Sequence, residues 1–533
     1  MKKDLNLLYN NIELSDNFPP DDISESSFEE IAVPYLQNPP KTIDISVGRQ
    51  LFVDDFLIEG TTLERIEHRP TEYLENPIFK AETNWETGTP EREWEEIRPS
   101  AAILFGGGVW YDGKLDKYRM WYTASFHGSV AYAESDDGIH FKRVNSDIYE
   151  NSNLVLPRGG SFFDTNSVIL NHYRENPMQE EYVMSLYVRP ERCERVGCNI
   201  YTSNDGIHWT MRAHTAGVDD TTTIFYNPFR KKWVYSIKKN DAEFGRRREY
   251  CECDTLPQGR ELKDRVFWLR ADEKDLRHQV WNVRPELYVF NSVAYESIML
   301  GEYTVFKGPQ NDISMKRGLP KVTELHIGYS RDGFHYSRQT DRTAFIKPSE
   351  KDGKWDCGYI HCPSSICTIQ DDILVFYYSA FAGDSDMIDP NYEERNGMYS
   401  NGSIGVAFLR RDGFASMSGK GELITRNLKF DGEYFFINAA SRNLRAEITD
   451  ENGVTISGFE AENCIPFNGD SCKQLMKWKT KGSLSELKGK IIKIRFIQDD
   501  GDLYTFWISK SPKGESGGYL AGGEKGKLGL CDI

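Results

Sequence analysis

One pentapeptide, Asp-Gly-x-His-aromatic, recurs in this chain and limits its possible fold more than any other feature. Its copies begin at Asp137, Asp205 and Asp332, and a shortened copy, Arg411-Asp412-Gly413-Phe414, follows. Successive aspartates are 68, 127 and 80 residues apart, so the middle interval is close to two periods with one copy lost. The spacing therefore predicts five repeats of one structural unit.

Each repeat contains strand-like segments only. The Asp-Gly pairs follow alternating segments such as Ser129–Glu134 and Cys198–Ser203, and glycine accepts the positive φ angle of a tight hairpin without strain. Strand-only repeats of this length are typical of a β-propeller with four-stranded blades. We therefore predict an all-β, five-bladed β-propeller in which the pentapeptide joins the third and fourth strands. Residues repeated in every blade cannot all contact one substrate, so the Asp and His of these turns are expected to be structural.

The 533-residue chain is long enough for a second domain. After about Gly419 the period disappears, although strand-like segments separated by Asp, Asn and Gly turns continue, which predicts a β-sandwich. The predicted parts are an N-terminal arm (1–48), the propeller (49–418), the β-sandwich (419–512) and a loose Gly-rich tail (513–533). Gln50–Ile58 is predicted to close the ring by pairing with the last blade.

Composition excludes several classes of function. The net charge of −17 argues against nucleic acid and against anionic membrane surfaces as partners. Neither a secretory signal nor a membrane span is visible, so we expect a cytoplasmic protein. The ten cysteines form no pair of Cys-x-x-Cys motifs, so neither a metal site, a disulfide framework nor a cofactor is predicted. A small carbohydrate is the expected partner, and a homo-oligomer is left open.

The innermost strands of a propeller converge on its axis, and one end of them lines a funnel that is the usual place for a site. Carboxyl groups from three blades are predicted to face this funnel, where burial and like charge make their pKa values unequal. The residues predicted to open or line the inner strands are Arg98, Asp164, Asn166, Asp219, Asp220, Tyr295, Glu296 and His361.

Unequal carboxyl groups are what glycoside hydrolysis requires: one protonates the glycosidic oxygen and another acts as nucleophile or as base on water. The apolar neighbours of Glu296 are expected to raise its pKa, which favours it as the acid. Asp164 and Asp220 would share the nucleophile or base role and the stabilising role. The remaining five residues would bind substrate. Each aspartate could instead cap a turn.

Two other functions remain open. The first is a sugar-binding propeller without turnover, whose acids could be splayed or capped by backbone. The second is a phosphorolytic enzyme similar to those of glycoside hydrolase family 130, which needs Arg, Lys or His side chains beside the acid to hold phosphate. Arg98, His361 and the Arg246-Arg247-Arg248 run are candidates for that role.

Three motifs resemble a known bacterial group: Arg49-Gln50-Leu51-Phe52-Val53-Asp54-Asp55, Ala294-Tyr295-Glu296-Ser297 and Arg410-Arg411-Asp412-Gly413-Phe414-Ala415-Ser416-Met417. The group is similar to glycoside hydrolase family 32 and more loosely to family 43. The resemblance implies a five-bladed propeller followed by a β-sandwich, and a glycosidase, which we expect to be exo-acting on a short oligosaccharide or a furanoside.

The chain departs from family 32 at its catalytic motifs. Blade one offers Arg98-Pro99-Ser100-Ala101 where the family has an acid, and no Arg-Asp-Pro occurs. Glu252-Cys253-Asp254 mimics the acid motif of the family but follows the third strand of its predicted blade, away from the axis. These departures argue against invertase activity.

Overall fold

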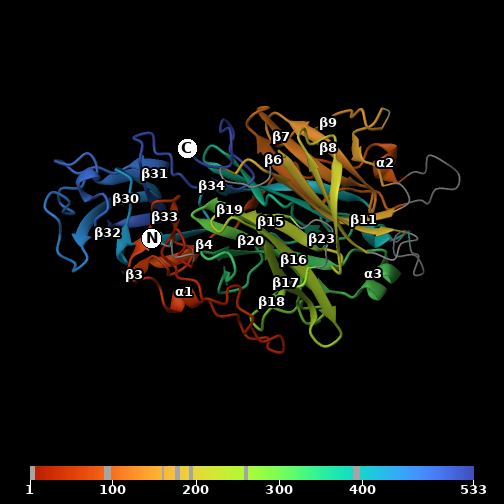
Figure 1. Cartoon of the computed structure of the whole chain (residues 1–533), viewed down its shortest axis with the longest axis horizontal. Coiled ribbons are helices and arrows are strands. Elements are labelled where there is room, and N and C mark those ends of the chain that lie inside the picture. The colour runs from red at the N-terminus through yellow and green to blue at the C-terminus, as the bar shows by residue number, and fades with distance from the viewer. Residues whose placement is uncertain are drawn as a thin grey trace.

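The computed structural model describes residues 6–88, 98–149, 151–158, 161–173, 180–190, 196–256, 262–387 and 397–533. It consists of five small sheets arranged as a ring and one eleven-stranded assembly beside them (Figure 1). The predicted all-β fold with a five-bladed propeller is confirmed. The helices of the described residues are short: α1 (Pro34–Gln37), α2 (Asn84–Thr87), α3 (Asn311–Arg317), η2 (Gly397–Tyr399) and η3 (Ser485–Leu487).

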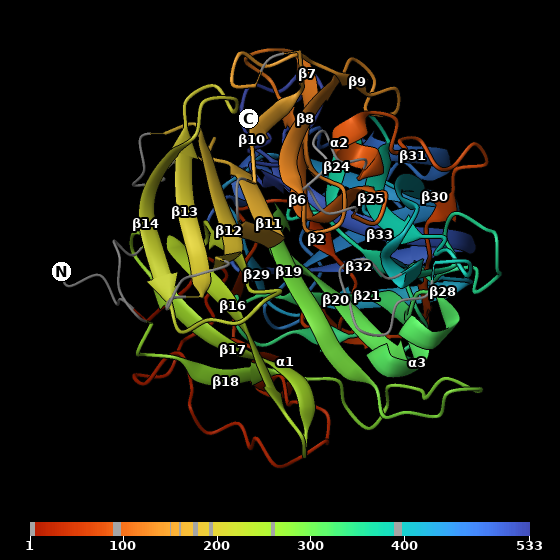
Figure 2. The same cartoon turned by 90° about the vertical axis from the view of Figure 1, so that its right-hand side faces the viewer.

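The first three blades follow one another along the chain, each with its first strand innermost (Figure 2). Blade one contains β6 (Ala102–Asp112), β7 (Lys117–Ala124), β8 (Ser129–Ser135), β9 (Lys142–Arg143) and β10 (Leu154–Leu156). Blade two contains β11 (Ser161–Leu170), β12 (Tyr182–Pro190), β13 (Gly197–Ser203) and β14 (Thr210–Ala216). Blade three contains β15 (Thr223–Asn227), β16 (Lys232–Asp241), β17 (Gly245–Cys253) and β18 (Val266–Leu269).

Blades four and five each include a strand from a distant part of the chain. Blade four contains β19 (Glu286–Glu296), β20 (Ile298–Gly308), β21 (Val322–Ser330), β22 (Ser337–Arg338) and β34 (Tyr519–Leu520). Blade five contains β23 (Gly358–His361), β24 (Cys367–Gln370), β25 (Ile373–Phe381), β26 (Gly402–Arg410) and β5 (Thr71–Glu72). The ring closes because β23 and β26 of blade five contact β6 of blade one.

The repeated pentapeptide forms the predicted turns. In the turn after β13, Oδ1 of Asp205 accepts the backbone N–H groups of Ile207 and His208 at 2.9 and 2.8 Å. Its Oδ2 lies 2.7 Å from Nδ1 of His208. The same contacts recur at Asp137 and Asp332. These carboxylates therefore hold turns together, which is the structural role expected of them.

The strand predicted to close the ring lies elsewhere. The outer strand of blade five is β5, whose residues Thr71 and Glu72 pair with β26. Within the predicted segment 50–58, β2 (Gln50–Leu51) pairs instead with β33 (Asp500–Ser509) of the eleven-stranded assembly. Phe52 and Leu57 are buried in the core of that assembly. The prediction was wrong because an alternating apolar strand fits either sheet, and only tertiary packing chooses between them.

The eleven-stranded assembly consists of two sheets that share the long strand β30 (Tyr434–Asp450). Their apolar side chains form one core, separate from that of the ring. The other strands are β1 (Ile43–Asp44), β2, β3 (Ile58–Thr61), β4 (Glu64–Glu67), β27 (Ala415–Ser418), β28 (Gly421–Thr425), β29 (Leu428–Lys429), β31 (Phe467–Leu475), β32 (Ile492–Gln498) and β33. Strands β1 to β4 thus pair outside the ring, although residues 49–67 were predicted to belong to it.

The Gly-rich tail is ordered against the ring, contrary to the predicted loose end. Strand β34 pairs with β19, and the backbone N–H of Gly522 donates to the Cys367 carbonyl at 2.8 Å. The Gly522 carbonyl in turn accepts the N–H of Tyr111 at 2.7 Å. A Cβ atom at Gly518 would lie 2.4 Å from Oε2 of Glu296. Glycine is therefore used here for close backbone approach, and not for freedom of motion.

Candidate active site at the start of the inner strands

Functional side chains gather at the end of the ring where the inner strands begin. Asp164 lies early in β11, Asp220 directly precedes β15, Tyr288 lies early in β19, and His361 ends the short strand β23. First strands of neighbouring blades run side by side in the same direction: the hydroxyls of Thr221 and Thr223 donate to the carbonyls of Tyr288 and Phe290 in turn. Their starts therefore share one end of the ring, which brings four blades together.

Asp164 is buried and held in its ionised form. Its Oδ1 accepts the backbone N–H of Thr165 at 2.8 Å, and its Oδ2 lies 3.3 Å from Nε2 of His127. Burial by itself raises the pKa of Asp164, but the hydrogen bond and charge of His127 and the charge of Arg189 hold that pKa well below its ordinary value. Asp164 is thus a carboxylate at neutral pH.

The pKa of Asp220 is shifted in the opposite direction, upward. Burial and then the negative charge of Asp164 raise the pKa of its carboxyl group, and Lys238 opposes this shift. Lys238 forms an ion pair with Oδ1 of Asp220, and Nη2 of Arg189 lies 2.5 Å from Oδ2. The side chain of Asp220 is 18% exposed, so a ligand in solvent can reach it.

Aromatic side chains lie beside the carboxyl groups of Asp164 and Asp220. The hydroxyl groups of Tyr288 and Tyr359 lie 3.0 Å apart, and Nζ of Lys321 lies 3.3 Å from the Tyr288 hydroxyl. The ring of His361 packs edge-on to Tyr359, with centroids 4.5 Å apart. Burial and then the positive charge of Lys321 lower the pKa of His361 to about 3, although Asp164 opposes this. His361 is therefore neutral, and it can accept or donate hydrogen bonds to a hydroxyl group.

The Arg246-Arg247-Arg248 run divides between two faces of β17, as the alternation of a strand requires. The Arg246 guanidinium lies 5.0 Å from the Tyr288 ring centroid, and Nη1 of Arg248 donates to the Thr221 carbonyl at 2.8 Å. Arg247, between them, pairs with Asp241 on the other side. Only Arg246 and Arg248 therefore belong to the site.

Three other residues predicted for the site, Asp219, Asn166 and Arg98, lie in different surroundings. Asp219 is half exposed and lies 3.2 Å from Nζ of Lys238, next to Asp220. Asn166 is buried, and its Oδ1 accepts the N–H of Gly107, which ties blade two to blade one. The backbone N–H of Arg98 donates to the Gly88 carbonyl at 3.3 Å.

Glu296 and Tyr295 do not belong to this site, which corrects the predicted placement of the acid. Both end β19, and Glu296 lies eight residues beyond Tyr288 on the same strand, or roughly 25 Å at the usual rise. Glu296 is fully buried, and its Oε2 accepts the Ser516 hydroxyl at 2.6 Å. Burial raises its pKa to about 7, as expected, but the group cannot meet Asp164 or Asp220.

The wrong placement of Glu296 comes from the hairpin between β19 and β20. The sequence predicts strands at Ser292–Leu300 and Tyr303–Lys307, which places a turn at Gly301-Glu302. In the structure β19 and β20 turn at Glu296-Ser297, where Glu296 takes φ +48°. Gly301 instead lies in mid-strand beneath aromatic rings, because a Cβ atom there would approach the Tyr336 ring to 2.7 Å. This glycine is required by packing and not by a turn, so it predicted the wrong position for the hairpin.

The three motifs that carry the family resemblance meet in one buried charge network. Nη1 of Arg49 lies 2.8 Å from Oδ2 of Asp412, and Nε of Arg49 lies 3.4 Å from Oε1 of Glu296. The Tyr295 hydroxyl donates to Oδ1 of Asp412 at 2.5 Å, and Arg411 lies 3.5 Å from Glu296. This network joins the ring to the eleven-stranded assembly. The motifs therefore meet where the two parts are joined.

Residues that sequence reasoning missed come from second and third strands. They are His127 between β7 and β8, Arg189 near the end of β12, Lys238 in β16 and Lys321 directly before β21. Second strands end, and third strands start, at the same end of the ring where first strands start. Charged residues that end a buried second strand, such as Lys238 after Trp233–Ile237, could have revealed this part of the site. By contrast, Glu252 of the family-32-like motif pairs with Arg230 at the far end of β17.

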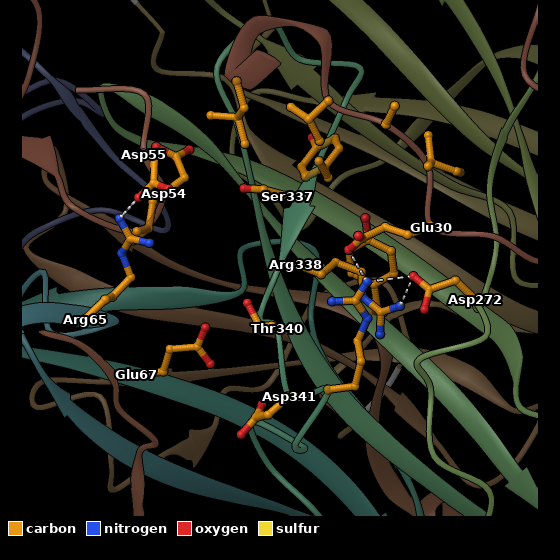
Figure 3. A pocket seen from close by; sticks show the side chains of 18 of the residues that line it. Glu30, Asp54, Asp55, Arg65, Glu67, Asp272, Ser337, Arg338, Thr340 and Asp341 are labelled. Carbon is orange, nitrogen blue, oxygen red and sulfur yellow. Dashed lines mark hydrogen bonds and ion pairs between the residues drawn. The ribbon is translucent and has the colours of Figure 1, made fainter. Parts of the chain in front are cut away.

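A separate cavity of about 780 Å³ lies on the outside of blade four, beside the N-terminal arm (Figure 3). Its charged groups pair with one another: Arg342 lies 2.7 Å from Asp272 and 2.6 Å from Glu30 of the arm. On the opposite wall Arg65 pairs with Asp55. The pair between Arg342 and Glu30 ties the arm to the ring, which is a structural role, so we do not assign the reaction to this cavity.

Within the described ranges, no group of three or more His, Cys, Asp or Glu side chains could hold a metal ion. No helix in that part of the chain has the length and apolar character needed to cross a membrane. Cysteines 198, 251, 253, 357, 362, 367, 464, 472 and 531 are free thiols, and Cys193 lies outside the described residues.

No protein-family model matches this chain, and no curated protein matches it by sequence. Solved structures do resemble it. A structure from the GH130 family of mannoside phosphorylases aligns at 14% identity over 64% of this chain and 93% of its own, with TM-score 0.40. A fructofuranosidase from Schwanniomyces occidentalis aligns at 9% identity over 83% and 96%, with TM-score 0.36. An α-L-arabinofuranosidase from Clostridium thermocellum aligns at 10% over 44% and 71%, with TM-score 0.28.

These structures resemble the chain in fold alone. At identities of 9 to 14% the alignments transfer no residue role to this chain.

Proposed function

We propose that this chain cleaves glycosidic bonds with Asp164 and Asp220 as its catalytic carboxyl groups. The supporting observation is their unequal environment. His127 and Arg189 lower the pKa of Asp164, whereas burial and the charge of Asp164 raise the pKa of Asp220. Two neighbouring carboxyls with opposite pKa shifts supply one proton donor and one anion at the same pH.

Asp220 takes the role of general acid that the sequence had suggested for Glu296. It donates its proton to the glycosidic oxygen as the bond to the anomeric carbon breaks, and Asp164 acts as nucleophile or as base on water. Arg189 and Lys238 position the Asp220 carboxyl through their ion pairs. We assign substrate hydroxyl binding to Asp219 and His361, and give Asn166 a supporting role between the two blades.

The finer features are also proposals. We propose exo-action on a short oligosaccharide or a furanoside, in the cytoplasm, without metal or cofactor. The expected partner is a small carbohydrate, and neither nucleic acid nor membrane is expected to bind a chain of net charge −17.

A panel of aryl furanosides and pyranosides tests the reaction. We expect Asp164→Asn and Asp220→Asn to lower kcat/KM by about 10²–10⁴-fold, which is the usual contribution of a general acid or base. Asp254→Asn is the matched control, because that aspartate is exposed and pairs with Lys232 far from the axis. Binding of a sugar by the parent without turnover would favour the alternative of a sugar-binding propeller.

A second candidate is phosphorolysis, which the cations around the two carboxyls favour. Arg189 and Lys238 contact Asp220, and Arg246 lies beside Tyr288. Guanidinium and ammonium groups are the usual ligands of phosphate. Adding inorganic phosphate to the same assay distinguishes the two reactions, because only phosphorolysis yields a glycosyl phosphate.

A further inference from the structure

Positive charge gathers at the axial site of a chain whose net charge is −17. Among the described residues, the arginine and lysine side chains at this site are Arg189, Lys238, Arg246, Arg248 and Lys321. The carboxyl groups there are Asp164, Asp219, Asp220 and Glu286. Once Asp220 holds the proton that the proposed reaction needs, these five side chains, together with His127 beside Asp164, face three carboxylates.

Arg248 contributes a buried charge whose hydrogen-bond partners are neutral. Its nitrogens donate to the carbonyl groups of Thr221 and Tyr288 and to the Thr221 hydroxyl. Within the described residues no carboxylate oxygen lies within 4.0 Å of it, and the residue is fully buried. Burial lowers its pKa to about 9, so it stays positive at neutral pH. Such a charge is costly unless an anion compensates it.

Arg246 and Lys321 lie beside the same ring. The Arg246 guanidinium and the Lys321 ammonium each lie 5.0 Å from the centroid of Tyr288. Arg246 is 16% exposed at its side chain, whereas Lys321 is buried and donates to Asn311 at 2.9 Å. Nη1 of Arg246 already pairs with Oε2 of Glu286 at 2.6 Å. The rest of its guanidinium and the Lys321 ammonium lie on the ring beside which a ligand would bind.

The buried imidazole of His361 points to an unfilled hydrogen bond at this position. His361 is 2% exposed, and its Nε2 has no hydrogen-bond partner among the described residues. Its ring contacts Tyr288 and Tyr359, with centroids 5.8 and 4.5 Å away. A polar atom buried without a partner costs free energy, which a ligand oxygen would recover.

We propose that the ligand beside Asp164 and Asp220 carries an oxyanion, and that Arg246, Lys321 and His361 hold it next to Tyr288. This proposal rests on the proposed glycosidic reaction and names the chemistry of its substrate. The oxyanion has two sources: a carboxylate on the sugar itself, or inorganic phosphate as the acceptor. Both are planar or tetrahedral oxygen groups that guanidinium and ammonium donors bind through charge-assisted hydrogen bonds.

The two sources give different products. With an acidic sugar and Asp164 as the base, a water oxygen forms the new bond to the anomeric carbon and gives one proton to Asp164. The glycosidic C–O bond breaks at the same time, and the leaving oxygen takes the proton of Asp220. With phosphate, a phosphate oxygen forms the bond to the anomeric carbon as the glycosidic C–O bond breaks, and Asp220 again protonates the leaving oxygen. The product is then a glycosyl phosphate, and no oxidant or further reactant is needed.

Titration calorimetry on the full-length chain tests the oxyanion site without relying on turnover. The probes are inorganic phosphate, glucuronate and galacturonate, with glucose and galactose as neutral counterparts. We expect at least one anionic probe to bind more tightly than its neutral counterpart. Arg246→Gln and Lys321→Gln should each weaken that binding by at least about tenfold. Arg247→Gln is the matched control, because its side chain lies on the other face of β17 and pairs with Asp241.

The inference and the proposed function can fail separately. If Asp220→Asn binds an anionic probe as the parent does but does not turn over substrate, both stand. If Asp164→Asn and Asp220→Asn keep full activity while Arg246→Gln loses anion binding, the catalytic assignment fails and the oxyanion site stands. Equal binding of anionic and neutral probes, or equal anion binding by parent, Arg246→Gln and Lys321→Gln with unchanged melting temperatures, would overturn the oxyanion site.

Discussion

The Nε atom of Arg49 lies 3.4 Å from Oε1 of Glu296, and both side chains are almost completely excluded from solvent. The two residues are far apart in the sequence and come from different parts of the fold, the eleven-stranded assembly and blade four. Their contact joins two of the three motifs on which the resemblance to the family-32-like group rests. A carboxyl group that the sequence suggests as catalytic is therefore part of the contact between the ring and the eleven-stranded assembly.

Replacing Glu296 by glutamine should change stability with pH but leave the reaction intact. Burial raises the pKa of Glu296 to about 7 from 4.5. The stability associated with its proton is fully present below the unfolded pKa and is lost as the pH rises through the folded one. The unfolding free energy of the parent should therefore fall relative to Glu296→Gln between pH 4.5 and 7, by roughly 3 kcal/mol.

Urea denaturation of both proteins across this range measures the difference. At a pH where both are folded, kcat should be the same, since Glu296 lies at the far end of β19 from Tyr288. A difference in unfolding free energy that does not vary with pH would contradict the raised pKa. A loss of kcat in the folded variant would return Glu296 to the reaction.

Replacing Lys238 by glutamine should move the alkaline limb of the pH–rate profile. The ammonium group of Lys238 lowers the pKa of Asp220, which burial and Asp164 raise. Without it the Asp220 pKa rises further, so the acid keeps its proton, and activity persists, to higher pH. Lys239→Gln is the matched control, because Lys239 pairs with Glu25 on the other face of β16. A shift of the limb to lower pH would contradict Asp220 as the acid.

The repeated turn aspartates should differ in their effect on stability, although their sequences match. The side chain of Asp332 is 5% exposed, whereas that of Asp137 is 51% exposed. Removing a buried acceptor leaves backbone N–H groups without partners, at a cost of about 1–3 kcal/mol, and water replaces the exposed one. Asp332→Ala should therefore lower the unfolding free energy more than Asp137→Ala, with kcat unchanged in both. Equal losses in denaturant titrations would refute this.

The C-terminal tail should stabilise the ring through its buried leucines. Leu520 is fully buried against β19 and Leu528 is 75% exposed in the same segment. Leu520→Ala should cost about 2–5 kcal/mol of unfolding free energy, as a core truncation does, while Leu528→Ala should stay within about 0.5 kcal/mol. Thermal and urea unfolding compare the pair. If both variants match the parent, the tail is not part of the cooperative fold.

The sequence predicted the five blades correctly, but it placed the hairpin between β19 and β20 of blade four at the wrong residues. The Asp-Gly turns report directly on local backbone geometry, so β8, β13 and β21 end where the pentapeptides begin. Gly301 carries no such information, because it is selected by two aromatic rings from other strands. An error of a few residues in that hairpin moved Glu296 from one end of the ring to the other.

The candidate site was predictable only in part. Asp164, Asp220 and His361 could be inferred because they lie at the starts of inner strands, where the fold itself determines their direction. His127, Arg189 and Lys238 belong to loops and second strands; the position of Lys238 after a buried strand marks an end of the ring, but no neighbouring residue shows that these three meet Asp164 or Asp220. Their role follows from distances across blades.

The sequence by itself determined the number of blades, the turns between their outer strands and the all-β class, because repeats and turns depend on residues close together in the chain. Tertiary structure alone decided which carboxyl groups meet, which strand closes the ring and where the Gly-rich tail lies. Those outcomes depend on burial and charge between residues hundreds of positions apart, such as Arg49 with Glu296 and Gly522 with Tyr111. The pKa differences between Asp164 and Asp220 belong to the same category, since each pKa is determined by neighbours that only the closed ring brings together.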